Sequence, residues 1–160
     1  MWRRFQIVIL TMMLVILGAC SQSGNLLRTQ QPPWTQREPV LPGYFHAIGI
    51  HATGENSAEL AAQQARDEIS KTLQPMVLSW MENYVVSRAG MINEEQHFYV
   101  KQLLPAMLDM LLLETQIEDT WSGGGQYWVL LKLHEETSRQ LVIDALENDP
   151  ILREKIQSLP

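Results

Sequence analysis

Hydrophobic and polar residues alternate along residues 44–53, which read Tyr-Phe-His-Ala-Ile-Gly-Ile-His-Ala-Thr. A period of two is typical of a β-strand, because successive side chains point to opposite faces. One face of this predicted strand carries Tyr44, His46, Ile48 and Ile50, and the other carries Phe45, Ala47, Gly49 and His51. Gly54 is expected to end the strand.

A four-residue period follows and predicts one long amphipathic helix. Asn56 is expected to cap this helix with Glu59 as its capping-box partner, and Gly90 is expected to end it. Pro75 lies inside the pattern, so we expect a kink or a break there. The apolar stripe consists of Ala61, Ala65, Ile69, Leu73 and Val77, followed by Trp80 and Tyr84.

The next segment predicts a shorter helix and then another strand. Asn93 is expected to cap a helix that reaches about Leu104, where Pro105 limits it. Residues 111–121 alternate again, which indicates a strand with one buried and one solvated face. Its predicted inward residues are Leu111, Leu113, Thr115 and Ile117.

Three consecutive glycines at 123–125 separate this strand from a second alternating segment at 126–134, so the two segments predict a β-hairpin. Residues 135–148 read as a closing helix, and residues 149–160 as a tail that adds a short helix. The fold class is therefore α+β: a strand, a long helix and a β-hairpin over residues 44–148, with extra helices. We expect a three-stranded, mostly antiparallel sheet packed on the alanine-rich helix.

The first twenty residues have the organisation of a secretory signal. Arg3 and Arg4 precede a fifteen-residue, mainly apolar run that ends in small residues. The sequence Leu17-Gly18-Ala19-Cys20 resembles the lipobox of bacterial lipoproteins. That resemblance implies that residues 1–19 are removed and that the sulfur of Cys20 carries diacylglycerol. It also implies that the new amino group of Cys20 carries a further fatty chain. Ser21 after the cysteine would direct the protein to the outer membrane. The alternative is a transmembrane helix, which usually needs about 20 apolar residues.

Residues 20–43 are predicted to be a lipidated cysteine followed by a tether without regular structure, because they are rich in Pro, Gln and Ser and have no hydrophobic period. Trp34 is expected to be an exposed tether residue, with contact to lipid headgroups as the alternative. The tether would hold the domain clear of the bilayer, on the periplasmic side.

Charge and cysteine content narrow the functional classes. The chain has a net charge of −6, and cleavage after Ala19 removes two arginines and no acids, which leaves −8. Such an acidic protein gains little from phosphate backbones, so nucleic acid is not an expected partner. Cys20 is the single cysteine, which excludes an internal disulfide.

The domain also resembles a known family. Ala47-Ile48-Gly49 before the alanine-rich helix, Asp119-Thr120-Trp121 and Tyr127-Trp128-Val129 are similar to segments of the LPP-twenty lipoprotein family. The resemblance spans residues 44–134 and implies a dodecin-like core in an outer-membrane lipoprotein. Some relatives belong to envelope rings around the flagellar basal body. The family implies no catalytic residues, so Cys20 is the one site that it carries over.

No residue pattern predicts catalysis, a metal or a cofactor. The four histidines lack metal-ligand spacing, and no serine lies in a nucleophile elbow. We therefore expect a structural or assembly lipoprotein that works through envelope protein partners or as a homo-oligomer. Association with the flagellum is one form that this role could take. A lipoprotein that binds a small apolar ligand is the alternative, and an envelope enzyme is a third hypothesis. Four aromatic residues in the middle of the chain form a candidate interface, because aromatic side chains are typical of interfaces. These residues are Trp80, Tyr84, Phe98 and Tyr99. The alternative is that they belong to the core.

Overall fold

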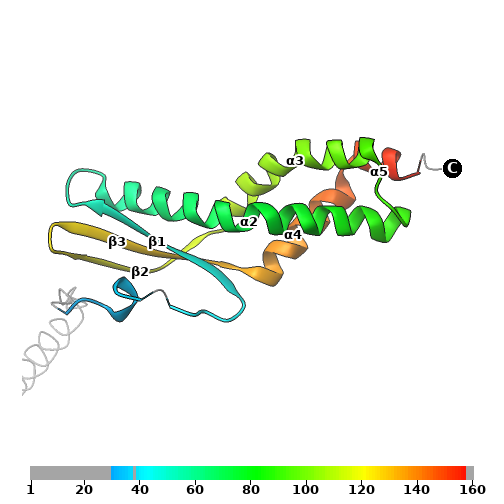
Figure 1. Ribbon diagram of the computed structural model, residues 1–160. Coiled ribbons are helices and arrows are strands. Elements are labelled where there is room, and N and C mark those ends of the chain that lie inside the picture. Colours follow the sequence, from blue (N-terminus) through cyan, green and yellow to red (C-terminus); the bar gives the residue numbers. More distant parts are fainter. Residues whose placement is uncertain (1–29, 38, 158–160) are drawn as a thin grey trace, which may run out of the picture. The chain divides into compact units, whose positions relative to one another are not determined.

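The computed structural model describes residues 30–37 and 39–157. Residues from Gln31 onward form one compact unit, and the description below concerns that unit. Its elements in chain order are η1 (Pro33–Thr35), β1 (Tyr44–Ala52), α2 (Ser57–Ala89), α3 (Glu94–Leu113), β2 (Gln116–Gly123), β3 (Gln126–His134), α4 (Glu135–Asn148) and α5 (Pro150–Gln157) (Figure 1).

The three strands form one antiparallel sheet in the order β1-β3-β2. The α+β prediction, with a strand, a long helix and a hairpin, is confirmed. The segments predicted for the first strand, the return strand and the closing helix match β1, β3 and α4 within one residue. The expected helical tail is α5.

Gly49 allows α2 to lie very close to the sheet. A Cβ atom at this position would stand 1.7 Å from the carbonyl oxygen of Ala61 and 2.8 Å from the backbone nitrogen of Ala65. Only glycine fits between two backbones at this distance, and the small alanines of α2 complete the approach. Val129 is opposite Gly49 in the register, so it points to the same face and is buried there.

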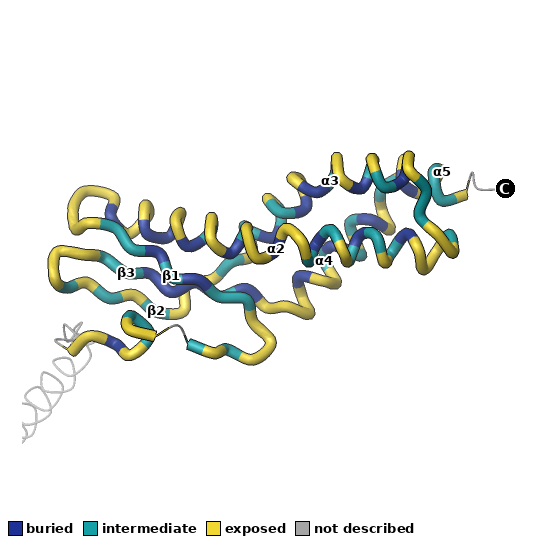
Figure 2. Tube along the Cα trace, viewed as in Figure 1, coloured by how far each residue is buried: buried dark blue, intermediate teal, exposed yellow. Residues whose placement is uncertain are grey.

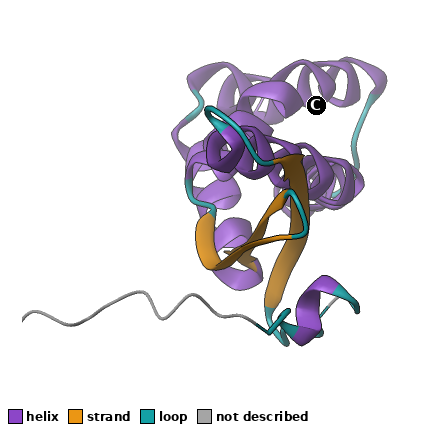
Figure 3. Ribbon diagram, turned by 90° about the vertical axis from the view of Figure 1, so that its left-hand side faces the viewer, coloured by secondary structure: helices purple, strands orange, loops and turns teal. Residues whose placement is uncertain are grey.

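The second half of α2 extends beyond the sheet and packs with α3, α4 and α5 (Figure 1). Figure 2 shows the buried positions recurring along one side of α2 through both halves. In Figure 3 the strands lie below most of the helices, and η1 lies lower still. The core is therefore continuous from the sheet into the helical part, and its α2 members are Ala61, Ala62, Ala65, Ile69, Leu73, Val77, Met81 and Val85.

Two prolines do not end their helices. Pro75 lies inside α2 and Pro105 inside α3. Of the kink or break expected at Pro75, the break is therefore excluded, and the limit expected at Pro105 is wrong. Proline removes one helical hydrogen bond, at a typical cost of about 3 kcal/mol. Buried neighbours on both sides, such as Leu73 and Val77 around Pro75, hold the helix in place and offset that loss.

The strand predicted from Leu111 starts later. Leu111 is fully buried as part of α3, where it continues the spacing of Leu104 and Met107, and β2 begins at Gln116. Leu113 and Ile117, both expected inward, are 84% and 58% exposed. The register of β2 also shifts between Ile117 and Asp119. Helical packing of Leu111 outweighed the local alternation of the sequence.

The helix ends follow two of the three predicted caps. Asn56 has a left-handed conformation with φ 61° and makes no side-chain capping bond, so the predicted capping box with Glu59 is wrong. Asn93 does cap α3, and its capping box uses Gln96. Gly90 ends α2 with φ 76°, and its N–H donates to the Val86 carbonyl at 2.8 Å.

Candidate functional site

The predicted lipidation site lies outside the described residues. Leu17, Gly18, Ala19 and Cys20 all belong to the undescribed part of the chain, so the lipobox stays a prediction. Within residues 30–37 and 39–157, none of the helices has the length and apolar character needed to cross a bilayer.

Part of the predicted tether has regular structure and is bonded to the sheet. Residues 33–35 form a 3-10 helix, which corrects the expectation of a tether without regular structure up to residue 43. The indole Nε1 of Trp34 donates to the Oδ2 atom of Asp119 in β2 at 2.9 Å, across 85 positions of sequence. Trp34 is half-buried rather than an exposed tether residue. We call residues 31–37 the clasp.

The clasp lies on the face of the sheet that α2 does not cover, which we call the second face (Figure 1). Gly49 and its partner Val129 point toward α2, so Leu130 and its partner Asp119 point away from it. Leu130 is only 3% exposed, yet it lies outside the core that α2 covers. Trp121 and Trp128 pair on the second face with ring centroids 6.3 Å apart. Around Asp119, the second face is thus apolar and aromatic.

A second feature lies where α3 passes into β2. The helix α2 packs on one face of the sheet, over β1 and β3, and leaves β2 open on that face. Ile117 is therefore exposed, and Leu113 at the end of α3 is exposed as well. Leu113 lines a hollow of about 420 Å³ together with Leu112 and the polar residues Gln63, Arg66 and Asp109. Leu113 and Ile117 form what we call the junction surface. Because exposed side chains of this kind gather at contact sites, the junction surface is a candidate for protein binding.

The structure does not gather the four aromatic residues of the predicted interface. Trp80 tilts against Phe45 of β1, with ring centroids 6.3 Å apart, while Tyr99 donates its hydroxyl to Asp149 at 3.2 Å. Phe98 is 63% exposed on α3. Trp80, Tyr84 and Tyr99 therefore serve packing between elements, and Phe98 alone is presented to solvent.

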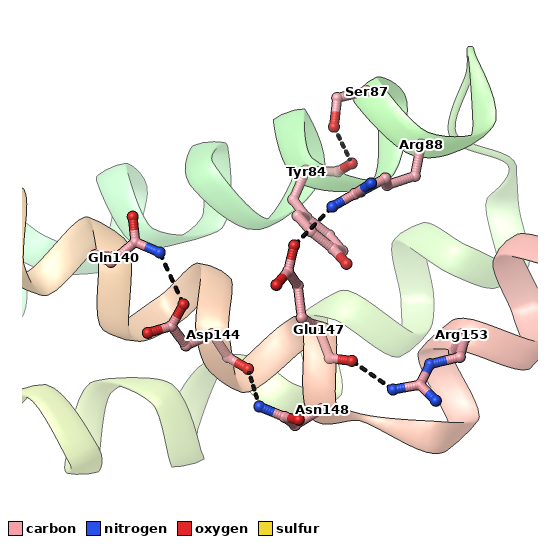
Figure 4. A network of polar contacts seen from close by, with 8 residues as sticks. All are labelled: Tyr84, Ser87, Arg88, Gln140, Asp144, Glu147, Asn148 and Arg153. Carbon is pink, nitrogen blue, oxygen red and sulfur yellow. Dashed lines mark hydrogen bonds and ion pairs between the residues drawn. The ribbon is translucent and has the colours of Figure 1, made fainter.

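Tyr84 belongs to a network of polar contacts between α2, α4 and α5 (Figure 4). Arg88 stacks over the Tyr84 ring and pairs with Glu147 at 2.6 Å. Arg153 donates to the backbone oxygen of Glu147 at 2.7 Å. These residues line a hollow of about 450 Å³ with Ile156 and Gln157. Because the charged groups are largely exposed, water screens them and each ion pair contributes little stability.

The ionisable groups with shifted pKa values are explained by their neighbours in the fold. Burial raises the pKa of Tyr99, and the Asp149 carboxylate beside it adds to the effect. The hydrogen bond to Glu118 raises the pKa of Lys132.

The histidines of the helical elements have structural roles. His97 Nδ1 lies 2.8 Å from Glu82 on α2, and His134 Nδ1 accepts the Thr137 N–H at the start of α4. In the part of the chain that the structure describes, no group of three or more His, Cys, Asp or Glu residues is placed to hold a metal ion.

No protein-family model matches the chain, and no curated protein matches it closely enough to indicate a relative. The resemblance to the LPP-twenty family therefore stays a prediction. The structure shows an α+β protein with a clasped second face and an exposed junction surface.

Two features of residues 32–34 signal the clasp, although hydrophobic periodicity does not reveal it. Pro32 and Pro33 precede Trp34, and proline is favoured at the first position of a helix. A lone tryptophan in a polar segment also needs a place to bury its ring. Its partner, Asp119, lies too far along the chain for local patterns to connect them.

Proposed function

We propose that this protein is a lipid-anchored, periplasm-facing lipoprotein of the bacterial outer membrane with a structural or assembly role. Lipid on Cys20 fixes the mature amino terminus in the bilayer, and the domain contacts other envelope proteins. The lipobox-like sequence at residues 17–20 supports the anchor. The acidic net charge supports protein rather than nucleic acid as the partner.

The junction surface is the observation that carries the contact role. Leu113 is 84% exposed at the end of α3, and Ile117 is 58% exposed at the start of β2. Burial of apolar surface contributes about 25 cal/mol per Å², so a partner that covers these side chains gains stability.

A photo-crosslinking amino acid in place of Leu113 is expected to trap a protein partner in living cells. The matched control is the same amino acid in place of Lys101, which is exposed on the same helix. We expect a discrete adduct on a denaturing gel from position 113 and none from position 101. Absence of adducts from both positions would contradict a contact role for the junction surface.

A small apolar ligand is the second candidate function. The hollow beside Tyr84 is lined largely by charged and polar groups, namely Arg88, Glu147, Arg153 and Gln157. Ligand sites for apolar molecules are lined mainly by apolar side chains. The lining of this hollow therefore does not suit a small apolar ligand, and the contact role of the junction surface is preferred.

A further inference from the structure

We propose that the clasp sets the distance between the domain and the membrane, by docking part of the tether on the second face of the sheet. This inference rests on the proposed lipid anchor at Cys20. When the clasp is closed, the anchored chain meets the domain at residue 31, beside Trp34. When it is open, the chain meets the domain at Tyr44, where β1 begins.

The two states differ strongly in reach. A fully extended chain spans at most about 3.5 Å per residue. The ten residues 21–30 therefore reach at most about 35 Å, whereas the 23 residues 21–43 reach about 80 Å.

Local contacts prepare the clasp for docking. Pro32 is buried and has φ −63° and ψ 146°, the polyproline II conformation. The Thr35 hydroxyl donates to the Pro32 carbonyl at 2.7 Å, and the Arg37 N–H donates to the Pro33 carbonyl at 3.1 Å. Proline restricts the open chain as well, so docking costs less conformational entropy than it would for a glycine-rich tether.

The bond between Trp34 and Asp119 joins the clasp to β2. Indole is a hydrogen-bond donor only, and a carboxylate is a strong acceptor. The bond is partly buried, so water competes for it less than at an open surface. The second face supplies the apolar surroundings, with Leu130 buried beside the position of Asp119. Removal of the Trp34 N–H should therefore weaken docking and leave the core on the other face intact.

Trypsin cleavage after Arg37 measures opening of the clasp, because the protease needs several extended residues around the cut. The protein is the mature chain purified in detergent. We expect Trp34→Phe, which keeps a ring but removes the N–H, to speed cleavage about tenfold, the ratio that corresponds to about 1.4 kcal/mol. Trp34→Ala should speed it further. Ser122→Ala, on the opposite face of β2, is the matched control and should leave the rate unchanged.

Energy transfer to a membrane acceptor measures the reach directly. Lys101→Cys supplies a single labelling site, because the sulfur of Cys20 is occupied by lipid in the proposed anchor. In vesicles of phosphatidylethanolamine and phosphatidylglycerol, Trp34→Phe in this background should lower transfer to a headgroup dye. Faster cleavage together with lower transfer supports the proposal.

Three other outcomes are separable. Unchanged cleavage in both Trp34 variants overturns the clasp, and faster cleavage with unchanged transfer overturns its role in reach. Failure of the wild-type protein to join vesicles contradicts the proposed lipid anchor and with it the role in reach, while cleavage still tests docking alone. Urea denaturation separates opening of the clasp from unfolding of the domain. A loss of unfolding free energy of up to about 1.4 kcal/mol in Trp34→Phe matches release of the clasp, whereas a larger loss would mean that cleavage reports unfolding.

Discussion

Gly49→Val is expected to destabilise the protein by about 3 kcal/mol or more, because the new side chain cannot fit between β1 and α2. The nearest atoms to a Cβ at this position belong to the backbone of Ala61 and Ala65, which cannot rotate away as a side chain can. The helix would have to lift from the sheet, and the buried residues around Val129 would lose their contacts. Urea denaturation of the purified mature protein, followed by circular dichroism, measures the loss.

Gly54→Val is the matched control for this prediction. A Cβ at Gly54 meets no atom within 4 Å, and its φ lies outside the left-handed region. The control should stay within about 0.5 kcal/mol of the wild type, as most surface substitutions do. Equal stability of the two valine variants would show that α2 does not approach the sheet as described.

Gln96→Ala is expected to lower the free energy of unfolding by about 2–4 kcal/mol. Gln96 is 1% exposed, and its side chain links two parts of the fold. Its oxygen accepts the Asn93 N–H at 3.0 Å, and its amide donates to the Lys155 carbonyl of α5 at 2.9 Å. Alanine would leave both backbone groups without these partners and would leave a cavity.

Gln102→Ala tests whether this cost comes from burial and bonding rather than from the change of residue type. Gln102 lies in the same helix and is exposed, so alanine should be neutral or slightly stabilising through its helix propensity. Urea midpoints of the two variants give the comparison. A small effect of Gln96→Ala, similar to that of Gln102→Ala, would contradict the structural role of the link between α3 and α5.

Periodicity predicted those parts of the fold whose buried side chains repeat locally. The strand pattern around Gly49 and the four-residue stripe of α2 each place a whole face in the core, so the pattern and the packing agree. The alternation of residues 126–134 is of the same kind, since Val129, Leu131 and Leu133 are buried. In these segments the local hydrophobic pattern and the tertiary packing favour the same structure.

The errors arose where a distant contact outweighed a local preference. Pro75 and Pro105 disfavour helix by themselves, but burial on both sides of each proline keeps α2 and α3 continuous. Leu111 fits a strand pattern and a helix stripe equally well, and packing in α3 decides between them. Trp34 lies in a segment typical of disorder, and its place depends on Asp119, 85 positions away.

The candidate site was less predictable than the fold. The four aromatic residues chosen as an interface share a region of sequence, yet their side chains serve different contacts. The junction surface was not foreseen because Leu113 and Ile117 were expected to be inward. Their exposure follows from the late start of β2 and from the position of α2 over β1 and β3, which local patterns do not report.

The lipid anchor is the central claim, because both the contact role and the clasp act on a domain tied to a bilayer. One fatty chain holds a protein only marginally, whereas several chains together hold it almost permanently. Removal of the acceptor sulfur should therefore release the protein.

Labelled palmitate in growing cells, compared between the wild type and Cys20→Ser, tests this claim most directly. We expect the wild type to incorporate the label and to fractionate with membranes, and Cys20→Ser to do neither. A wild-type protein that never takes up palmitate, with Cys20→Ser still fractionating with membranes, would contradict the account.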